Sequence, residues 1–340
     1  MNQVQVIGTH NSYHSGLTEP GKAMLRARNP QAVDALDYVH PSLTSQLDSG
    51  ARQVELDVFA DARGGLYARP QAAAAPGAPP FDPQGLMRRP GFKVLHVQDL
   101  DYVSTCQPFT GCLRELRAWS RAHPRHAPLF VLVETKASPI RGDPPLTTPE
   151  PIDTAALDRL DAEIRSVFPE RELITPDLVR GGRATLEAAV LAGGWPTLEA
   201  ARGRIVFLLD QRANGPAYVE GHPALRGRAA FTNAEPGRAD AAFVERNEGS
   251  AEEIAGLVRR GYLVRTRADA DTRQARTGDT SRRDTALRSG AQMVSTDYPA
   301  AEPSRWTGYS VSLPGGVAVR CNPVNAPSAC ADAALERAGR

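Results

Sequence analysis

The sequence has no apolar run long enough to cross a membrane. Its 340 residues are 41% apolar and 23% charged, and no stretch approaches the ~18 consecutive apolar residues that a membrane span needs. It also lacks an excess of either charge, because 40 Lys and Arg stand against 39 Asp and Glu. Nucleic-acid binding needs a broad basic field, so we expect no nucleic-acid partner. Any anionic ligand must therefore be bound by a local site.

Cysteine is scarce, with four residues and no C-x-x-C spacing of the kind found in zinc sites. Cys106 and Cys112 lie close together in Pro/Gly-rich sequence, and so do Cys321 and Cys330. Two short-loop disulfides fit this spacing, with four unpaired thiols as the alternative. The strand-like start at Gln3 leaves no room for a signal peptide. A cytosolic protein would also lack one, but disulfides favour a secreted or periplasmic protein whose signal peptide is absent from this sequence.

Short apolar, β-branched runs alternate with helix-like segments, which is typical of repeated βα units. The segments 41–50, 153–168 and 250–261 are expected to be helices with one apolar face. Eight of the apolar runs are expected to be strands. Eight strands alternating with helices, in a chain somewhat longer than the ~250 residues typical of the fold, favour an α/β protein with a (β/α)8 TIM-like barrel. An open doubly wound sheet is second, because no Gly-rich phosphate fingerprint follows any strand. The expected strands are 4–8, 51–59, 92–97, 128–135, 204–209, 229–233, 261–266 and 291–296.

Two stretches depart from this alternation. The Ala/Pro-rich segment 67–85 is expected to be a long surface loop between the second and third strands. After Pro303 the sequence predicts an irregular tail with a small hairpin, held by the second cysteine pair. We therefore expect a barrel domain over residues 1–303 and a short C-terminal extension over 304–340 packed on it.

Polar side chains interrupt or end the expected strands. Barrel enzymes carry out their chemistry where strands end and βα loops begin, so these residues are candidates for a site. They are His10 and Asn11 after the first strand, Glu55 and Asp57 in the second, His96 at the end of the third, Glu134 and Lys136 at the fourth, Arg265 and Arg267 at the seventh, and Tyr298 after the eighth.

The two histidines favour proton transfer. A lone histidine is more often a core residue with satisfied ring nitrogens. His10 and His96, however, end two separate strands, and histidine is the side chain best suited to exchange protons near neutral pH.

The carboxylates favour a metal ion. Glu55, Asp57 and Glu134 would form an ion-pair network with Lys136 and the arginines in the alternative reading. Three carboxylates inside inner strands would nevertheless repel one another and cost several kcal/mol each to bury unpaired. A divalent cation resolves this conflict. Together with the amide oxygen of Asn11 they offer hard oxygen donors, which suit one Ca²⁺ ion and, less well, Mg²⁺.

The arginines and Tyr298 are either an exposed charged rim or part of a substrate site. Beside a metal and two histidines, guanidinium groups can grip a phosphate, and a tyrosine offers a face to a sugar-like ring.

Six motifs in order resemble one known family. They are "GTHNSYH", "ELDVFAD", "LHVQDLD", "FVLVETK", "VRTRADADT" and "GAQMVSTDYP", spread between residues 7 and 299. Together they resemble the bacterial Ca²⁺-dependent phosphatidylinositol-specific phospholipases C, within the phospholipase-C-like phosphodiesterase superfamily. The resemblance implies a TIM-like barrel of that type and leaves out the C-terminal tail.

The resemblance also implies roles for individual residues. The catalytic histidines correspond to His10 and His96. The calcium ligands correspond to Asn11, Glu55, Asp57 and Glu134, and the substrate-binding residues to Lys136, Arg265, Arg267 and Tyr298. His14 matches no member of this set and is expected to be a structural residue.

The implied reaction cleaves the glycerol–phosphate bond of phosphatidylinositol or a related inositol lipid at a membrane surface. The inositol 2-hydroxyl attacks phosphorus, giving a cyclic inositol phosphate and diacylglycerol, and the base is a ligand carboxylate such as Glu55, or His10. No stable protein partner is implied. The alternatives are a glycerophosphodiester phosphodiesterase or sphingomyelinase-D-like activity, and a degenerate barrel that binds lipid or glycan without catalysis.

Overall fold

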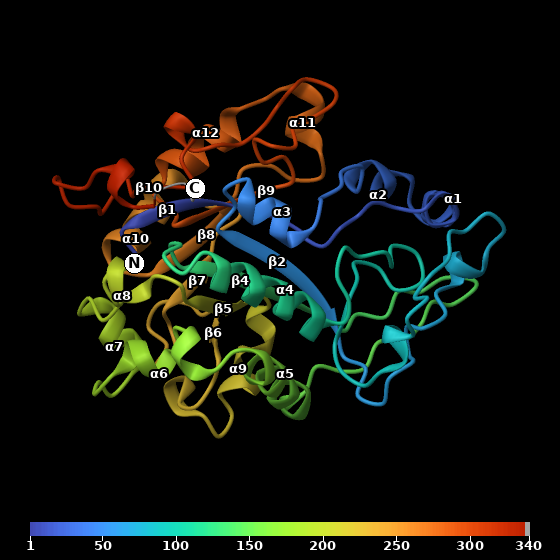
Figure 1. The fold of residues 1–340 in the computed structure, drawn as a ribbon, viewed down its shortest axis with the longest axis horizontal. Helices are drawn as coiled ribbons and strands as arrows, with labels where there is room; N and C mark the ends of the chain where they lie inside the picture. Colours follow the sequence, from blue (N-terminus) through green and yellow to red (C-terminus); the bar gives the residue numbers. More distant parts are fainter. Residues whose placement is uncertain (337–340) are drawn as a thin grey trace.

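A nearly closed barrel of eight parallel strands forms the centre of the molecule (Figure 1). This computed structural model describes residues 1–336. The strands run in the order β6-β5-β4-β2-β1-β9-β8-β7, and a parallel bridge between Asn233 and Phe243 joins the two ends. The predicted α/β barrel is therefore confirmed. Its strands are β1 (Val4–Thr9), β2 (Gln53–Phe59), β4 (Leu129–Lys136), β5 (Ile205–Leu209), β6 (Ala230–Thr232), β7 (Phe243–Glu245), β8 (Leu263–Arg267) and β9 (Met293–Thr296).

One of the eight predicted strands is wrong. The segment predicted at 92–97 contains only β3 (Lys93–Val94), which pairs antiparallel with β2 outside the barrel path. The strand that completes the set of eight is instead β7, which we did not predict. It is short and lies at the end of an Ala-rich run. An apolar β-branched pattern indicates an extended segment, but it does not indicate the partner strand or its direction.

Helices cover the outside of the barrel, as the sequence pattern predicts. In α4 (Phe109–Ala122), the side chains of Phe109, Leu113 and Leu116 are buried against the core. α5 (Thr154–Val167) begins where the Asp153 side chain accepts a hydrogen bond from the Ala156 amide. The remaining helices are α1 (Glu19–Arg28), α2 (Pro30–Ala35), α3 (Leu43–Asp48), α6 (Pro176–Arg180), α7 (Leu186–Leu191), α8 (Leu198–Ala201), α9 (Gly215–Val219), α10 (Ala251–Arg259), α11 (Arg273–Thr277) and α12 (Ser281–Arg288).

The helices predicted at 41–50, 153–168 and 250–261 correspond to α3, α5 and α10. The predicted loop at 67–85 contains one short 3₁₀ turn, Gln71–Ala74. No helix within residues 1–336 is long and apolar enough to span a membrane.

A glycine lets β1 and β2 approach each other. The two strands pair at a single position, Gly8 opposite Gln53. A Cβ at Gly8 would lie 1.9 Å from the Gln53 side-chain oxygen, so any larger residue would push β1 away from β2. The side chain of Gln53 fills this space and donates a hydrogen bond to the carbonyl of Thr9, at 3.3 Å.

The C-terminal tail adds a strand to the sheet outside the barrel path, rather than the small hairpin that we predicted. β10 (Val319–Cys321) pairs antiparallel with β1, with Val4 opposite Cys321. The two predicted disulfides, Cys106–Cys112 and Cys321–Cys330, are both present. The second one closes a loop directly after β10.

Candidate active site

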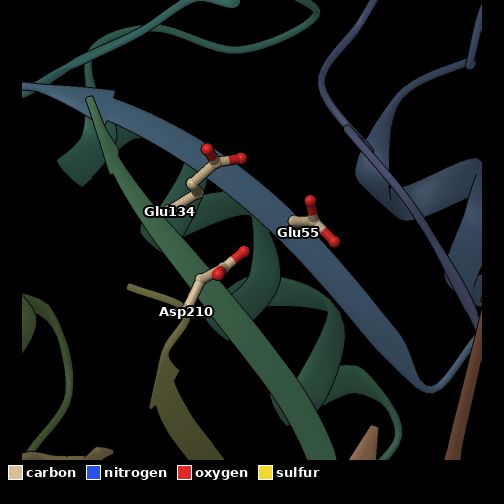
Figure 2. Close-up of side chains that lie close together, drawn as sticks. All are labelled: Glu55, Glu134 and Asp210. Atoms are coloured by element: carbon tan, nitrogen blue, oxygen red, sulfur yellow. The ribbon is translucent and has the colours of Figure 1, made fainter. Parts of the chain in front are cut away.

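Three carboxylates meet at the carboxyl end of the barrel strands (Figure 2). Glu55 lies in β2, Glu134 in β4, and Asp210 directly follows β5. One oxygen of each lies within 4.8 Å of the others. β2 and β4 pair in parallel with Asp57 opposite Glu134, which places a fourth carboxylate beside this cluster.

The buried surroundings of this cluster disfavour the ionised form of its carboxyl groups. Burial, with nearby carboxylates as a further cause, raises the pKa of Glu55 to about 8. Burial also raises the pKa of Asp210 to about 9, followed by the charges of Glu245 and Glu55. Each group therefore holds a proton near neutral pH unless a cation compensates its charge.

Two side-chain cations already contact the carboxylates. The ammonium group of Lys136 lies 3.0 Å from Asp57 and 2.6 Å from Glu134. Arg265 is buried and donates a 2.5 Å hydrogen bond to Glu55. Arg265 also forms an ion pair with Glu245, so with all five carboxylates ionised the two cations leave an excess of negative charge that a divalent ion would reduce.

The proposed metal ligands also include oxygens without hydrogen-bond partners. Asn11 Oδ1 is buried and has no partner among the described residues, while its Nδ2 donates to Tyr38 at 2.8 Å. Both oxygens of Asp57 likewise lack a hydrogen bond, although Lys136 forms an ion pair with one of them. Buried oxygens are normally satisfied. These oxygens and the three-carboxylate cluster fit a hard cation such as Ca²⁺.

His10 is held by a carboxylate on one side and faces the cluster on the other. Its Nδ1 lies 2.7 Å from Asp297, and its Nε2 lies 3.5 Å from Glu55 and 3.2 Å from a guanidinium nitrogen of Arg267. Burial first, then the charges of Arg267 and Arg265, lower the pKa of His10 well below its usual value. In a neutral imidazole that donates from Nδ1 to Asp297, Nε2 is the acceptor nitrogen, and it faces Arg267 and Glu55.

His96 has the same arrangement with a different carboxylate. It lies just beyond β3 and not at the end of a barrel strand, but its Nδ1 contacts Asp101 at 3.0 Å. Its side chain is 18% exposed, so its other nitrogen is open to a ligand. Burial and the charge of Asp57 raise the pKa of Glu134, and the opposing contributions include Lys136 and His96. His96 therefore lies within electrostatic reach of the acidic cluster.

The predicted substrate-binding residues separate into two groups. Lys136 and Arg267 are partly exposed beside the carboxylates and His10. Arg265 is enclosed by its bonds to Glu55, Asn247 and Ser295. Tyr298 is 5% exposed and packs edge-on against other aromatic rings, so its contact with substrate stays a prediction.

Comparison with known proteins shows the family of this chain. The family model for Ca²⁺-dependent phosphoinositide phospholipase C matches residues 1–323. This chain belongs to that phospholipase C family. Its fold is similar to a calcium-dependent phosphoinositol-specific phospholipase C from a Pseudomonas species, with 17% identity, 94% of each chain covered and a TM-score of 0.57. No curated protein matches the sequence.

A second solved structure has the same fold. A Ca²⁺-dependent phosphatidylinositol-specific phospholipase C from Streptomyces antibioticus is 20% identical, with 87% of this chain and 94% of that chain covered and a TM-score of 0.52. The phospholipase C prediction is thus confirmed by the family match, which favours neither the glycerophosphodiesterase-like alternative nor the non-enzymatic one. The family is Ca²⁺-dependent, and the acidic cluster of Glu55, Glu134 and Asp210 could hold a metal ion.

Several residues of this phospholipase C site were missed from the sequence. Asp210 follows a predicted strand directly, which is the same signal that identified Glu134 and His10. Asp101 and Tyr38 lie in loops, where no strand pattern indicates direction or proximity. Only the three-dimensional arrangement shows that they contact the histidines and Asn11.

Proposed function

We propose that this phospholipase C cleaves phosphatidylinositol, or a related inositol lipid, through attack of the inositol 2-hydroxyl on phosphorus. The observation that carries the proposal is the pair of partly exposed histidines, each with Nδ1 on a buried carboxylate. Phosphoryl transfer consists mainly of positioning and charge stabilisation, so an acid, a base and cations suffice.

The base in this proposal is His10, with Glu55 as its neighbour. His10 Nε2 takes the proton of the 2-hydroxyl as the oxygen–phosphorus bond forms. Asp297 accepts a hydrogen bond from Nδ1 and stabilises the resulting imidazolium. Glu55, 3.5 Å from Nε2, shares the positive charge that develops there.

The acid in this proposal is His96. When the bond between phosphorus and the glycerol oxygen breaks, Nε2 of His96 gives its proton to that oxygen, so diacylglycerol leaves neutral. The products are diacylglycerol and a cyclic inositol phosphate. Arg267 and Lys136 donate to phosphoryl oxygens and to ring hydroxyls of the substrate.

Ca²⁺ would be held by Asn11, Glu55, Asp57 and Glu134, with Asp210 as a further carboxylate. When bound, it acts as a Lewis acid that lowers the pKa of the hydroxyl and offsets the negative charge at phosphorus.

Exposed apolar residues support contact with a lipid surface. Among the described residues five large apolar side chains are exposed, and Val39, Leu66 and Ile140 lie in the loops that follow β1, β2 and β4. These loops surround the carboxyl ends of the strands, where the site lies. The disulfides additionally support a secreted or periplasmic enzyme.

The experiment that tests this function separates products from metal binding. Purified protein is incubated with phosphatidylinositol vesicles, with Ca²⁺ or with a chelator, and the products are followed by ³¹P NMR. A cyclic inositol phosphate that appears only with Ca²⁺ supports the proposal. If Ca²⁺ binds normally in calorimetry and no cyclic product forms, the proposal fails. His10→Ala and His96→Ala should each lower turnover by about 10²–10⁴-fold and leave Ca²⁺ binding intact, whereas Glu134→Gln should weaken Ca²⁺ binding itself.

A further inference from the structure

Asp101 contacts two histidines with the same oxygen atom. Its Oδ2 lies 3.0 Å from Nδ1 of His96 and 2.9 Å from Nε2 of His14. Asp101 and His14 are completely buried, while His96 is partly open. The three side chains thus form a chain of contacts that runs from buried His14 through Asp101 to the partly exposed His96.

The buried pair behind His96 is stable as an ion pair. Burial alone would neutralise both partners, but their mutual contact outweighs it, so the pKa of His14 is raised and that of Asp101 is lowered. The other groups near His14 are the ring of Tyr38, with centroids 4.9 Å apart, the charge of Asp297, and His96 itself.

Main-chain hydrogen bonds hold His96 and His14, the two ends of this chain of contacts, in place. The His96 amide donates to the carbonyl of Asp101 at 3.1 Å, which closes a tight loop between the two residues. The His14 amide donates to the carbonyl of Asn11 at 2.8 Å, and a β-bridge joins His14 to Ser104. His14 therefore connects the loop that follows β1 with the loop that carries His96.

We propose that His14 is a positioning residue that acts through Asp101 to aim the imidazole of His96 at the departing glycerol oxygen. Through its 2.9 Å ion pair with Oδ2, His14 fixes the side-chain rotamer of Asp101, and Asp101 in turn fixes the tautomer and ring plane of His96. This inference rests on the proposed role of His96 as the acid. It changes our reading of His14, which we had expected to be structural only.

The test compares two leaving groups. The glycerol oxygen of phosphatidylinositol needs a proton to leave, whereas the nitrophenolate of 4-nitrophenyl myo-inositol 1-phosphate leaves without one. His14→Phe keeps a ring of similar size but removes the cationic nitrogen that pairs with Asp101, and should lower kcat on phosphatidylinositol by about 10- to 100-fold. On the nitrophenyl ester the loss should stay below about threefold, because the acid is not needed there.

Three further variants complete the design. His14→Gln keeps an N–H at the position of Nε2 and should restore most of the lost kcat. Asp101→Asn should show the same selective loss on the lipid as His14→Phe, and it carries the test if the phenylalanine variant does not fold. Tyr13→Phe removes a buried hydroxyl without a partner next to His14, and it should change neither rate.

The possible outcomes are distinguishable. Selective loss on the lipid, with rescue by glutamine, supports the positioning role. Equal losses on both substrates, or no loss in His14→Phe and Asp101→Asn, overturn it. His96→Ala on the two substrates tests the underlying assignment separately. If that variant loses both activities equally, His96 is not the acid and the proposed function fails at that step.

Discussion

Lys136 occupies the space between two proposed metal ligands. It contacts Asp57 at 3.0 Å and Glu134 at 2.6 Å, and its side chain is 24% exposed. The sequence placed it among the substrate-binding residues, and the structure adds a second role. Lys136 compensates the charge of the carboxylates that we propose as Ca²⁺ ligands, so the two cations would compete for the same oxygens.

Replacement of Lys136 by methionine tests whether the lysine compensates the charge of these carboxylates. Lys136→Met leaves buried carboxylates without their cation and should lower the free energy of unfolding, without Ca²⁺, by about 3 kcal/mol. Saturating Ca²⁺ should restore most of this loss, so the Ca²⁺-induced rise in Tm should be larger in the variant than in the parent protein. Differential scanning calorimetry with and without chelator measures both values. Lys22→Met, in an exposed pair with Glu19, is the control. Equal Tm shifts would contradict competition for the same oxygens.

His126 makes the stability of the protein depend on pH, far from the site. It is 2% exposed, contacts the Ser120 hydroxyl at 2.7 Å and donates to the carbonyl of Ala127. Burial lowers its pKa from 6.5 to about 4. Because the unfolded chain binds a proton at higher pH than the folded chain does, stability is lost as the pH falls from 6.5 towards 4.

The expected loss from this one group is about 3 kcal/mol of unfolding free energy between pH 7 and pH 4. Urea unfolding at several pH values measures it. His126→Gln should flatten the curve over this interval, while His222→Gln, at a half-exposed position, should leave the slope unchanged. An unaltered slope in His126→Gln would show that His126 is not the source.

At the scale of the elements, β10 and its disulfide stabilise the amino-terminal half of β1. β10 pairs with residues 4–6, and the Cys321–Cys330 bridge follows it. His10 and Asn11 lie beyond the opposite end of β1. The bridge should therefore contribute to stability and not to catalysis.

Replacing both cysteines of this bridge by alanine should destabilise the protein by about 2 to 3 kcal/mol, because the unfolded chain loses a short covalent loop. Chemical denaturation measures this change. Turnover of the folded variant on a soluble substrate should equal that of the parent protein. If kcat falls although the variant is fully folded, β10 instead positions His10. The matched variant without Cys106 and Cys112 tests the bridge near the Asp101 loop.

The sequence predicted seven of the barrel strands and three of the helices, α3, α5 and α10, because these depend on local apolar periodicity. It failed at 92–97 and at β7, where the partner strand decides the structure. Glu55 and Glu134 were visible as charges in apolar strands. The contact of His96 with Asp101, and of Asp101 with His14, arises between loops, and no periodic pattern encodes such a contact.

At the scale of the whole molecule, exposed apolar side chains lie in two places: the loops near the proposed site and the helices α6 and α7. In Figure 1 the helices α1 and α2 lie at the right, the side towards which the arrow of β2 points, while α6 and α7 lie at the left. Val39 is 58% exposed between Tyr38 and His40, and Ile140 is 38% exposed in the loop after β4. Leu178 and Leu191, in α6 and α7, are 47% and 48% exposed.

This difference gives a matched test of membrane orientation. Val39→Asp and Ile140→Asp should each weaken binding to phosphatidylinositol vesicles by about tenfold, because a lost apolar contact of ~1.5 kcal/mol is replaced by a charge. Leu178→Asp and Leu191→Asp should leave vesicle binding unchanged. Sedimentation with sucrose-loaded vesicles measures the affinity, and turnover of a soluble substrate should be equal in all four variants. Equal effects in both places would exclude the proposed orientation.

The pairing of β1 has a consequence for fragments of the chain. β1 carries His10 at its end and lies between β2 and β9, with β10 along its first residues, and the His10 amide donates to the carbonyl of Thr296. Two partners of β1 thus lie almost three hundred residues further along the chain. The surroundings of His10 are complete only when β9 has paired with β1, so a fragment that ends before β9 should lack this site.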